Sequence, residues 1–390
     1  MTDIYDVIVV GAGPAGSTAA RFSAMGGVKT ILLEKHPVIG YPLCCAEAIS
    51  ITGLTRVVEP DPRWISSKIE KIKLYGPNSA LATINHPDAG YILERKIFDR
   101  ALAEQAAKAG ADVRVGIDVV DLIHDENGKI CGVTAFNNGQ IIEIAGRVII
   151  AADGVESQIA GKAGLKTVLK PKQIHSAYQY LLAGVDIEPD TLEFYLGTTV
   201  APGGYIWVFC KGGELANVGV GVCPSKSPGK KPVDYLNEFI DRRFKSYRVL
   251  EKMTGGIPSY MADLSLFKDN VMVVGDAARV VDSFTGAGIA NALLSGKIAG
   301  RTAPEIINNG IKADAYAREF NSIKQKELKY YYYSRELFLK MTDNDFISAL
   351  KFIDDIFGDK SVSAINPLEI IKKIILAHPR LLKIGRHLLF

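Results

Sequence analysis

The sequence lacks several features that would place it in common protein classes. It contains no run of about 18 apolar residues and no charged-then-apolar leader before its first apolar stretch, so we expect no membrane-spanning helix. Its five cysteines form no CxxC pair and no Cys/His ligand spacing. We therefore expect reduced thiols, no metal site and a cytoplasmic protein.

A strong net charge is also absent, because 46 basic residues nearly balance 43 acidic ones for a net charge of +3. The balance is uneven, since residues 366–390 contain five basic residues and one acid. Apolar residues alternate with these bases in a helix-like pattern that is interrupted at Pro379. This tail is either a basic amphipathic element that contacts an anionic membrane surface, or a helix pair packed on the body with a solvated basic face. We expect no nucleic-acid partner.

The chain does contain a glycine-rich turn between two predicted elements near its start. Residues 7–10, which follow Asp6, are apolar and predict a buried strand, and residues 17–25 predict a helix. The turn between them reads Gly-Ala-Gly-Pro-Ala-Gly, and a second apolar strand over residues 30–33 ends in Glu34. This strand, turn, helix and strand form a dinucleotide-binding fingerprint in its full context.

Each residue of this fingerprint has a physical role. Gly11 permits the tight turn, Gly13 lets the backbone approach a pyrophosphate, and Gly16 lets the helix pack closely on the strand. The helix start supplies free N–H donors and partial positive charge, and Glu34 is placed for a ribose hydroxyl. The sequence therefore predicts a nucleotide cofactor.

Beyond Glu34, the secondary structure that the sequence predicts changes several times along the chain. Residues 60–90 carry four prolines and predict short strands and turns. Residues 141–144 and 147–151 predict two further strands, and residues 172–260 alternate strand patterns with Gly/Pro turns. The last region predicts an antiparallel sheet inserted into an α/β lobe, and helical patterns dominate from residue 303 onward.

Three separated segments point to the same kind of fold. They are the fingerprint, Asp153 after one apolar strand, and Gly275-Asp276 after another. Together they resemble FAD-dependent proteins of the para-hydroxybenzoate hydroxylase fold over roughly residues 1 to 300. In that resemblance Asp276 binds a ribityl hydroxyl of FAD. Gly288 and Ile289 open a helix whose N–H groups face the flavin pyrimidine edge, where reduced flavin carries negative charge.

Two passages resemble the geranylgeranyl reductase family within this fold. Residues 40–48 are similar to the family's loop with a cysteine beside the flavin, and residues 202–211 are similar to its signature of Tyr, Trp and Phe at alternate positions ending in Lys. On a strand Tyr205, Trp207 and Phe209 share one face, so they could line a channel for an apolar substrate chain. Taken without the resemblance, they also fit a buried aromatic sheet face.

The resemblance implies both the cofactor contacts and a catalytic candidate. The implied FAD contacts are Gly11, Gly13, Ala15, Gly16, Glu34, Cys45, Ala46, Ala48, Arg95, Val119, Asp153, Gly275, Asp276, Gly286, Gly288 and Ile289. Cys45 is the candidate near flavin N5, either as proton donor or as a group that shapes the site, because a free thiol is protonated at neutral pH. A small buried apolar residue is the alternative reading of Cys45. Ala48, Cys210 and Ser283 stand where the family commonly has glycine, proline and proline.

The implied architecture is α/β (α+β) with three parts. A Rossmann-like FAD-binding domain comprises residues 1–60, 90–165 and 266–302, and a β-sheet substrate domain comprises residues 61–89 and 166–265. Residues 303–390 form a C-terminal helical region.

The implied function is FAD-dependent saturation of C=C bonds in geranylgeranyl chains of archaeal-type membrane-lipid precursors, by hydride from reduced flavin N5 plus a proton. Two alternatives stay open: a flavin monooxygenase or halogenase of the same fold, and a non-catalytic flavin electron carrier. The two tryptophans, Trp64 and Trp207, form no halogenase tryptophan motif. No second GxGxxG precedes a helix that could bind NADPH permanently. The electron donor could therefore be ferredoxin, another reduced carrier, or NADPH that binds transiently. The enzyme would act in the cytoplasm or at the membrane surface.

Overall fold

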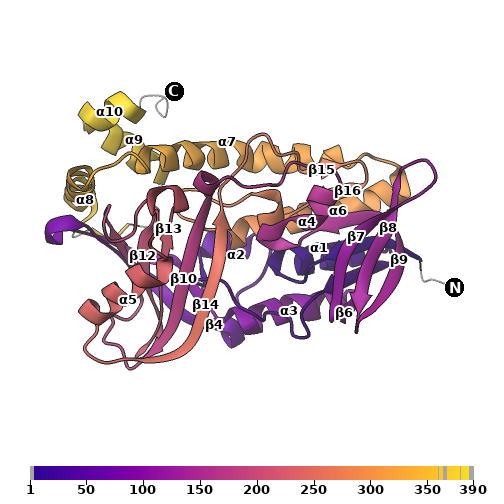
Figure 1. The fold of residues 1–390 in the computed structure, drawn as a ribbon, viewed down its shortest axis with the longest axis horizontal. Helices are drawn as coiled ribbons and strands as arrows, with labels where there is room; N and C mark the ends of the chain where they lie inside the picture. The colour runs from indigo at the N-terminus through magenta and orange to yellow at the C-terminus, as the bar shows by residue number, and fades with distance from the viewer. Residues whose placement is uncertain (1–3, 359, 363–366, 378, 386–390) are drawn as a thin grey trace.

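Two eight-stranded sheets form the framework of the protein, and the C-terminal helices run along one side of it (Figure 1). The computed structural model describes residues 4–358, 360–362, 367–377 and 379–385. No helix in these described ranges combines the length and apolar character needed to cross a membrane.

The first sheet is largely parallel and carries the N-terminal strand at its centre. Its path is β15-β16-β9-β1-β2-β6, and β7 and β8 attach through β9. Val7, Ile8 and Val9 of β1 are fully buried because both neighbours of this strand are parallel and both faces of the sheet are covered. The strands are β1 (Ile4–Val10), β2 (Thr30–Glu34), β6 (Asp112–Val115), β7 (Ile117–His124), β8 (Ile130–Asn137), β9 (Gln140–Ala151), β15 (Phe267–Lys268) and β16 (Val271–Val273).

Strand β9 differs from the prediction of two separate strands. It is continuous over twelve residues, because its first half pairs antiparallel with β8 and its second half pairs parallel with β1. The strand thus joins the hairpin β7–β8 to the parallel core.

The second sheet has the order β14-β10-β13-β12-β11-β4-β5-β3, and all its neighbouring strands are antiparallel except the parallel pair β11 and β4. The predicted inserted antiparallel sheet is therefore present with one parallel pair. Its strands are β3 (Ala48–Ile49), β4 (Ile65–Tyr75), β5 (Leu81–Leu93), β10 (Ile174–Ala183), β11 (Thr191–Leu196), β12 (Tyr205–Gly212), β13 (Leu215–Val222) and β14 (Arg248–Pro258).

Residues 60–90 form two long strands, β4 and β5, instead of the predicted short ones. The pairing jumps from Ile69 opposite Gly90 to Lys71 opposite Asn85, so Pro87 lies in a bulge outside the ladder. Strand β5 runs across the predicted domain boundary at residues 89 and 90, and β3 belongs to the second sheet. The division into domains itself stays a prediction.

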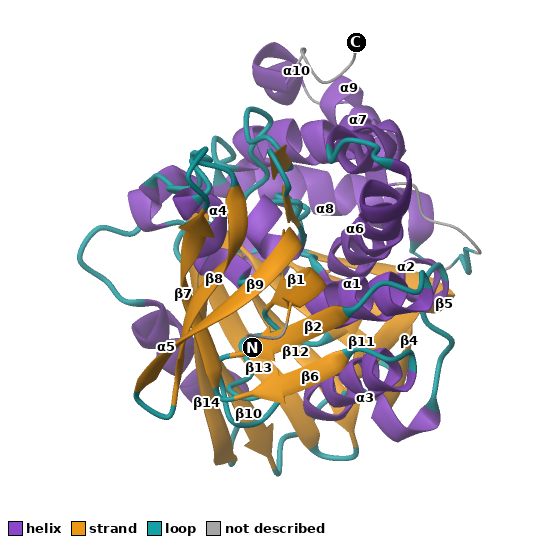
Figure 2. Ribbon diagram, turned by 90° about the vertical axis from the view of Figure 1, so that its right-hand side faces the viewer, coloured by secondary structure: helices purple, strands orange, loops and turns teal. Residues whose placement is uncertain are grey.

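Helices cover both sheets. In Figure 2, α7, α9 and α10 lie at one end of the molecule and α3 and α5 at the other. The helices are α1 (Pro14–Met25), α2 (Ile51–Thr55), α3 (Arg95–Lys108), α4 (Gln158–Lys162), α5 (Pro232–Arg243), α6 (Ile289–Asn309), α7 (Asp314–Phe338), α8 (Asp343–Phe357), α9 (Pro367–Ala377) and α10 (Pro379–Gly385).

The apolar side of the C-terminal tail packs on the protein. Ile371 and Ile375 of α9 and Leu381 of α10 form a buried cluster with Leu337 of α7. This arrangement matches the packed helix pair considered for the tail. Arg386 lies outside the described residues.

Candidate functional site

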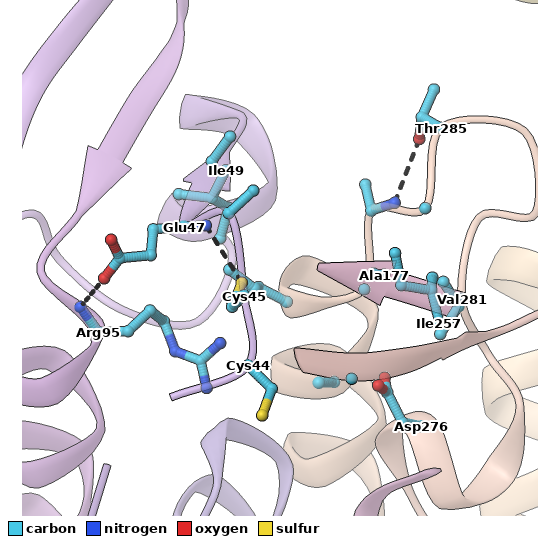
Figure 3. A pocket seen from close by; sticks show the side chains of 18 of the residues that line it. Cys44, Cys45, Glu47, Ile49, Arg95, Ala177, Ile257, Asp276, Val281 and Thr285 are labelled. Atoms are coloured by element: carbon cyan, nitrogen blue, oxygen red, sulfur yellow. Dashed lines mark hydrogen bonds between the residues drawn. The ribbon is translucent and has the colours of Figure 1, made fainter. Parts of the chain in front are cut away.

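A cavity of about 530 Å³ lies where the glycine-rich turn, the cysteine loop and the second sheet meet. It has polar groups on the side of the first sheet and aromatic side chains on the side of the second; Figure 3 shows part of its lining. Of the predicted site residues, those that line it are Gly13, Ala15, Cys45, Ala46, Ala48, Arg95, Tyr205, Trp207, Phe209, Asp276, Gly286, Gly288 and Ile289. The predicted residues that do not line it are Gly11, Gly16, Glu34, Val119, Asp153 and Gly275.

The glycine-rich turn presents an uncapped helix start to this cavity. Gly13 is the N-cap of α1, and no side chain in the described ranges forms a capping hydrogen bond there. A Cβ on Gly13 would meet nothing within 4 Å, whereas one on Gly16 would lie 1.8 Å from the carbonyl oxygen of Gly11. The turn can therefore adopt this shape only with glycine at position 16, and its open N–H groups can receive an anion such as a pyrophosphate.

Three predicted cofactor residues make contacts within the protein. Glu34 accepts the N–H of Ala12 at 2.8 Å and so ties the turn to the end of β2. Val119 is a residue of β7 whose side chain lies in the core. Asp153 accepts the N–H of Ile159 at 2.9 Å, while its other oxygen is buried with no hydrogen-bond partner among the described residues. Their predicted cofactor contacts stay predictions.

Asp276 offers an acceptor that the protein does not use. Its carboxylate faces the cavity, and no donor in the described part of the chain hydrogen bonds to it. Burial raises the pKa of Asp276, and the nearby Arg95 and Arg279 partly oppose this shift. Asp276 is half-buried and lines the cavity, so its carboxylate, which has no donor among the described residues, fits a bound hydroxyl such as that of the FAD ribityl chain.

The start of α6 faces the same cavity. Gly288 is its N-cap, and no side chain occupies the cap position. The first N–H groups of α6 and the partial positive charge of the helix therefore lie open toward a negatively charged ring edge. Together with Asp276 and the uncapped start of α1, the residues fit FAD.

The loop before α6 is held by its own polar side chains. Asp282 accepts the N–H groups of Phe284 at 2.8 Å and Thr285 at 3.1 Å, and burial raises the pKa of Asp282 to about 6. Ser283 accepts the N–H of Tyr260 at 2.8 Å, so serine ties this loop down where the family commonly has proline. The hydroxyl of Tyr205 donates to the Thr285 carbonyl, which links the loop to β12.

Strand β12 places its aromatic side chains as the alternation predicts. Tyr205, Trp207 and Phe209 face the cavity, whereas Ile206 and Val208 pack in the cluster under α5. The indole N–H of Trp207 donates to Gln179 at 2.7 Å, so its one polar group is satisfied. Trp207 and Phe209 are buried in a cluster with Ile69 and Ile92, and the parts of the three rings that line the cavity form an apolar wall.

The two cysteines of the loop have different surroundings. Cys44 is exposed and donates to the Thr254 carbonyl at 3.0 Å. Cys45 accepts the N–H of Glu47 at 3.2 Å, and Figure 3 shows the two cysteine side chains directed apart. Burial raises the pKa of Cys45 and the charge of Arg95 partly offsets it, so Cys45 is a protonated thiol at neutral pH.

Arg95 is itself held in place, because Asp99 accepts two hydrogen bonds at 2.7 Å from its guanidinium group. This ion pair fixes a positive charge at the edge of the cavity near Cys45.

Sequence reasoning did not single out four buried polar residues around the cysteine loop. The carboxylate of Glu47 contacts Lys211 and accepts the Asn217 side-chain N–H at 2.7 Å, and Gln179 donates to the Cys45 carbonyl at 3.0 Å. Glu47 and Lys211 lie in the two passages that resemble the family, so their opposite charges could have predicted an ion pair between these passages. An isolated Gln or Asn in a strand carries no such signal.

Two further departures from the family pattern lie in strands of the second sheet. Ala48 begins the extended strand β3, where alanine needs no special backbone, and the positive φ of this loop falls on Glu47 at 73°. Cys210 is buried and pairs with Ala216 just before a bulge at Lys211.

Comparisons with known proteins agree with this site. A family model described as the geranylgeranyl reductase catalytic domain matches residues 173–257, and one described as FAD dependent oxidoreductase matches residues 6–199. The digeranylgeranylglycerophospholipid reductase of Methanocella arvoryzae is 40% identical, with 98% of each chain covered. That of Methanosarcina acetivorans is 45% identical over 80% of this chain and 77% of its own. The chain belongs to the geranylgeranyl reductase family.

Solved structures place this family member in the expected fold. A geranylgeranyl bacteriochlorophyll reductase-like protein from Thermoplasma acidophilum is 35% identical with a TM-score of 0.91, and 99% of each chain is covered. A flavin-dependent brominase is 18% identical with a TM-score of 0.73, covering 98% of this chain and 94% of its own, and shares the fold alone. The protein is an FAD-dependent oxidoreductase, and the predicted para-hydroxybenzoate hydroxylase type of fold and FAD cofactor are confirmed.

Proposed function

We propose that this protein saturates C=C bonds in the geranylgeranyl chains of archaeal-type membrane-lipid precursors. The main support for this proposal is the cavity. It places the groups that fit FAD opposite an apolar wall of Tyr205, Trp207 and Phe209. Its family relatives are named for the reduction of digeranylgeranylglycerophospholipids, which carry such chains. An aromatic wall suits an alkene chain because it excludes water and offers only dispersion contacts.

Saturating an alkene requires a hydride on one carbon and a proton on its neighbour. FAD, when bound and reduced, supplies the hydride. We assign the proton to the thiol of Cys45, which lines the cavity and whose burial keeps it protonated. The S–H bond breaks as the new C–H bond forms, and solvent returns a proton to the thiolate. Asp276, Gly288 and the turn at Gly13 would hold the cofactor.

We further propose that α9 and α10 contact an anionic membrane. While their buried face packs on α7, Leu376 is 60% exposed and Leu382 is 36% exposed beside Lys372, Lys373 and Lys383. Exposed basic and apolar side chains along the same helices are typical of peripheral membrane contact. Sedimentation with phosphatidylglycerol vesicles is expected to fall in K372E/K373E/K383E and to persist in the control K166E/K170E/K172E. Equal binding by both variants would contradict the assignment.

The enzyme also needs an external reductant, and we propose ferredoxin, another reduced carrier or NADPH. The fingerprint at residues 11–16 is the single one of its kind in the sequence, which favours a donor that docks transiently. Stopped-flow measurement of flavin reduction in the FAD-loaded protein tests each of the three donors in turn. The donor that reduces the flavin within the turnover time is the physiological class, and slow reduction by all three would remove them.

The function is tested by the flavin absorbance of the dithionite-reduced protein under anaerobic conditions. Addition of digeranylgeranylglyceryl phosphate is expected to restore the oxidised spectrum, whereas addition of glyceryl phosphate without chains is not. Reoxidation only with oxygen and an aromatic compound would instead support a monooxygenase.

A further inference from the structure

Two buried charges join the passages that carry the family resemblance. Glu47 follows Cys45 by two residues, and Lys211 is the penultimate residue of the aromatic strand β12. Their side chains form an ion pair in which Lys211 is 3% and Glu47 is 1% exposed. Lys211 also contacts Glu94 at 2.9 Å. Because both charges lose their hydration, a pair at this depth is a poor source of net stability, and its retention points to another role.

Glu47 has a backbone conformation that non-glycine residues seldom adopt. Its φ is 73°, in the left-handed region. Three donors hold its carboxylate there: the backbone N–H of Arg95 at 2.8 Å, the Asn217 amide at 2.7 Å and the Lys211 ammonium group. The side chain therefore anchors a strained backbone that would otherwise relax.

The consequence of this conformation falls on Cys45. The N–H of Glu47 points at the Cys45 sulfur at 3.2 Å, and Figure 3 shows this contact together with the one to Arg95. From the other side, Gln179 donates to the Cys45 carbonyl at 3.0 Å. A backbone N–H directed at sulfur stabilises the thiolate relative to the thiol.

We propose that the Glu47–Lys211 ion pair is a positioning device for Cys45, which holds the Glu47 N–H against the sulfur and so fixes the thiol in the cavity. Lys211 and Glu47 are thus positioning residues that act through Cys45. The inference rests on the proposed function only where it gives Cys45 a part in proton delivery. The other charged group that acts on the sulfur is Arg95 from α3. Two further titratable groups line the same cavity: Cys44, whose side chain points away from Cys45, and Asp276.

The test measures the reactivity of Cys45 in the FAD-loaded protein. Alkylation by iodoacetamide is followed between about pH 6 and pH 11 by mass spectrometry of the Cys45 peptide, which separates it from the other four cysteines. The midpoint of the profile is the pH at which Cys45 is alkylated at half its maximal rate. In K211M we expect this midpoint to rise by about one pH unit and alkylation near neutral pH to slow about tenfold, because the N–H contact is lost. K211R, which retains the charge, is expected to recover most of the wild-type profile.

A matched control removes a lysine from an ion pair elsewhere in the same sheet. Lys73 of β4 pairs with Glu188, which Lys71 also contacts, so K73M leaves that carboxylate paired. Its Cys45 profile should equal that of wild type. An unshifted K211M profile, or an equal shift in K73M, would overturn the proposal.

A second variant keeps the test decisive if K211M does not fold. N217L removes one donor to Glu47 without changing any charge, and it also removes a buried amide oxygen that has no hydrogen-bond partner among the described residues. We expect its midpoint to rise by a smaller amount, and an unchanged midpoint in N217L would overturn the proposal.

Turnover of the lipid separates this inference from the proposed function. In K211M the kcat should fall while the KM for the lipid stays constant, since the aromatic wall is untouched. If Cys45 takes no part in proton delivery, kcat stays constant although the alkylation profile still shifts.

Discussion

The indole ring of Trp207 lies directly over a glycine of the neighbouring strand, so one added methyl group tests the aromatic wall. A Cβ at Gly219 would lie 2.3 Å from Cζ2 and 2.5 Å from Cε2 of Trp207. Non-bonded carbons approach no closer than about 3.4 Å, so in Gly219→Ala the ring must move by about 1 Å into the cavity. The hydrogen bond from Trp207 to Gln179 would break or lengthen.

The size of the effect follows from three terms. Overpacking costs about 1–3 kcal/mol and the lost hydrogen bond about 0.5–1.5 kcal/mol. The smaller entropy of an unfolded chain with alanine offsets about 0.4–1 kcal/mol. We expect a net loss of about 2 kcal/mol in the free energy of unfolding, within a range of about 0.5–4. Because the cavity narrows, the KM for the lipid should rise.

Gly221→Ala is the matched control, since it is the same substitution two residues along β13. A Cβ there would lie 3.7 Å from Trp207, which is ordinary contact. Its unfolding free energy should stay within about 0.5 kcal/mol of wild type. Urea denaturation of both FAD-loaded variants, followed by tryptophan fluorescence, makes the comparison. Equal losses in the two variants, or an unchanged KM in Gly219→Ala, would refute the reasoning.

Two further predictions concern buried titratable groups. Asp276→Ala should weaken FAD binding about 10- to 150-fold in a fluorescence titration, while the cofactor-free protein gains stability because a buried carboxylate without a donor is removed; tighter FAD binding would contradict this. Burial and Arg335 lower the pKa of His175 from 6.5 to about 4, so its contribution to stability is complete above pH 6.5 and is lost as pH falls toward 4. His175→Gln should remove about 2 kcal/mol of the loss that urea denaturation measures between pH 7 and pH 5, and identical pH profiles would rule out this role.

Local patterns predict much of this fold. The glycine-rich turn and the strands β1 and β2 follow from hydrophobic periodicity and glycine spacing within about 30 residues. The long strands β4 and β5 do not, because four prolines in residues 60–90 suggest breaks. Only the pairing register, which places Pro87 in a bulge, shows how a continuous ladder avoids it.

The site also has features that could be predicted from local sequence and features that depend on the complete fold. The alternation of Tyr205, Trp207 and Phe209 is a property of one strand and could be predicted. The contact between Glu47 and Lys211 joins residues 164 apart in the chain, so it depends on how the cysteine loop lies against the second sheet. Opposite charges in two passages suggest a pair only once the fold brings those passages together.

The central claim is tested most directly by mass spectrometry of the lipid itself. Digeranylgeranylglyceryl phosphate is incubated anaerobically with the reduced FAD-loaded protein, and with Trp207→Ala as the variant of the aromatic wall. We expect lipid masses that rise by two hydrogens for each double bond reduced, with a lower yield in Trp207→Ala at limiting lipid. An unchanged lipid mass alongside full flavin reduction would contradict it.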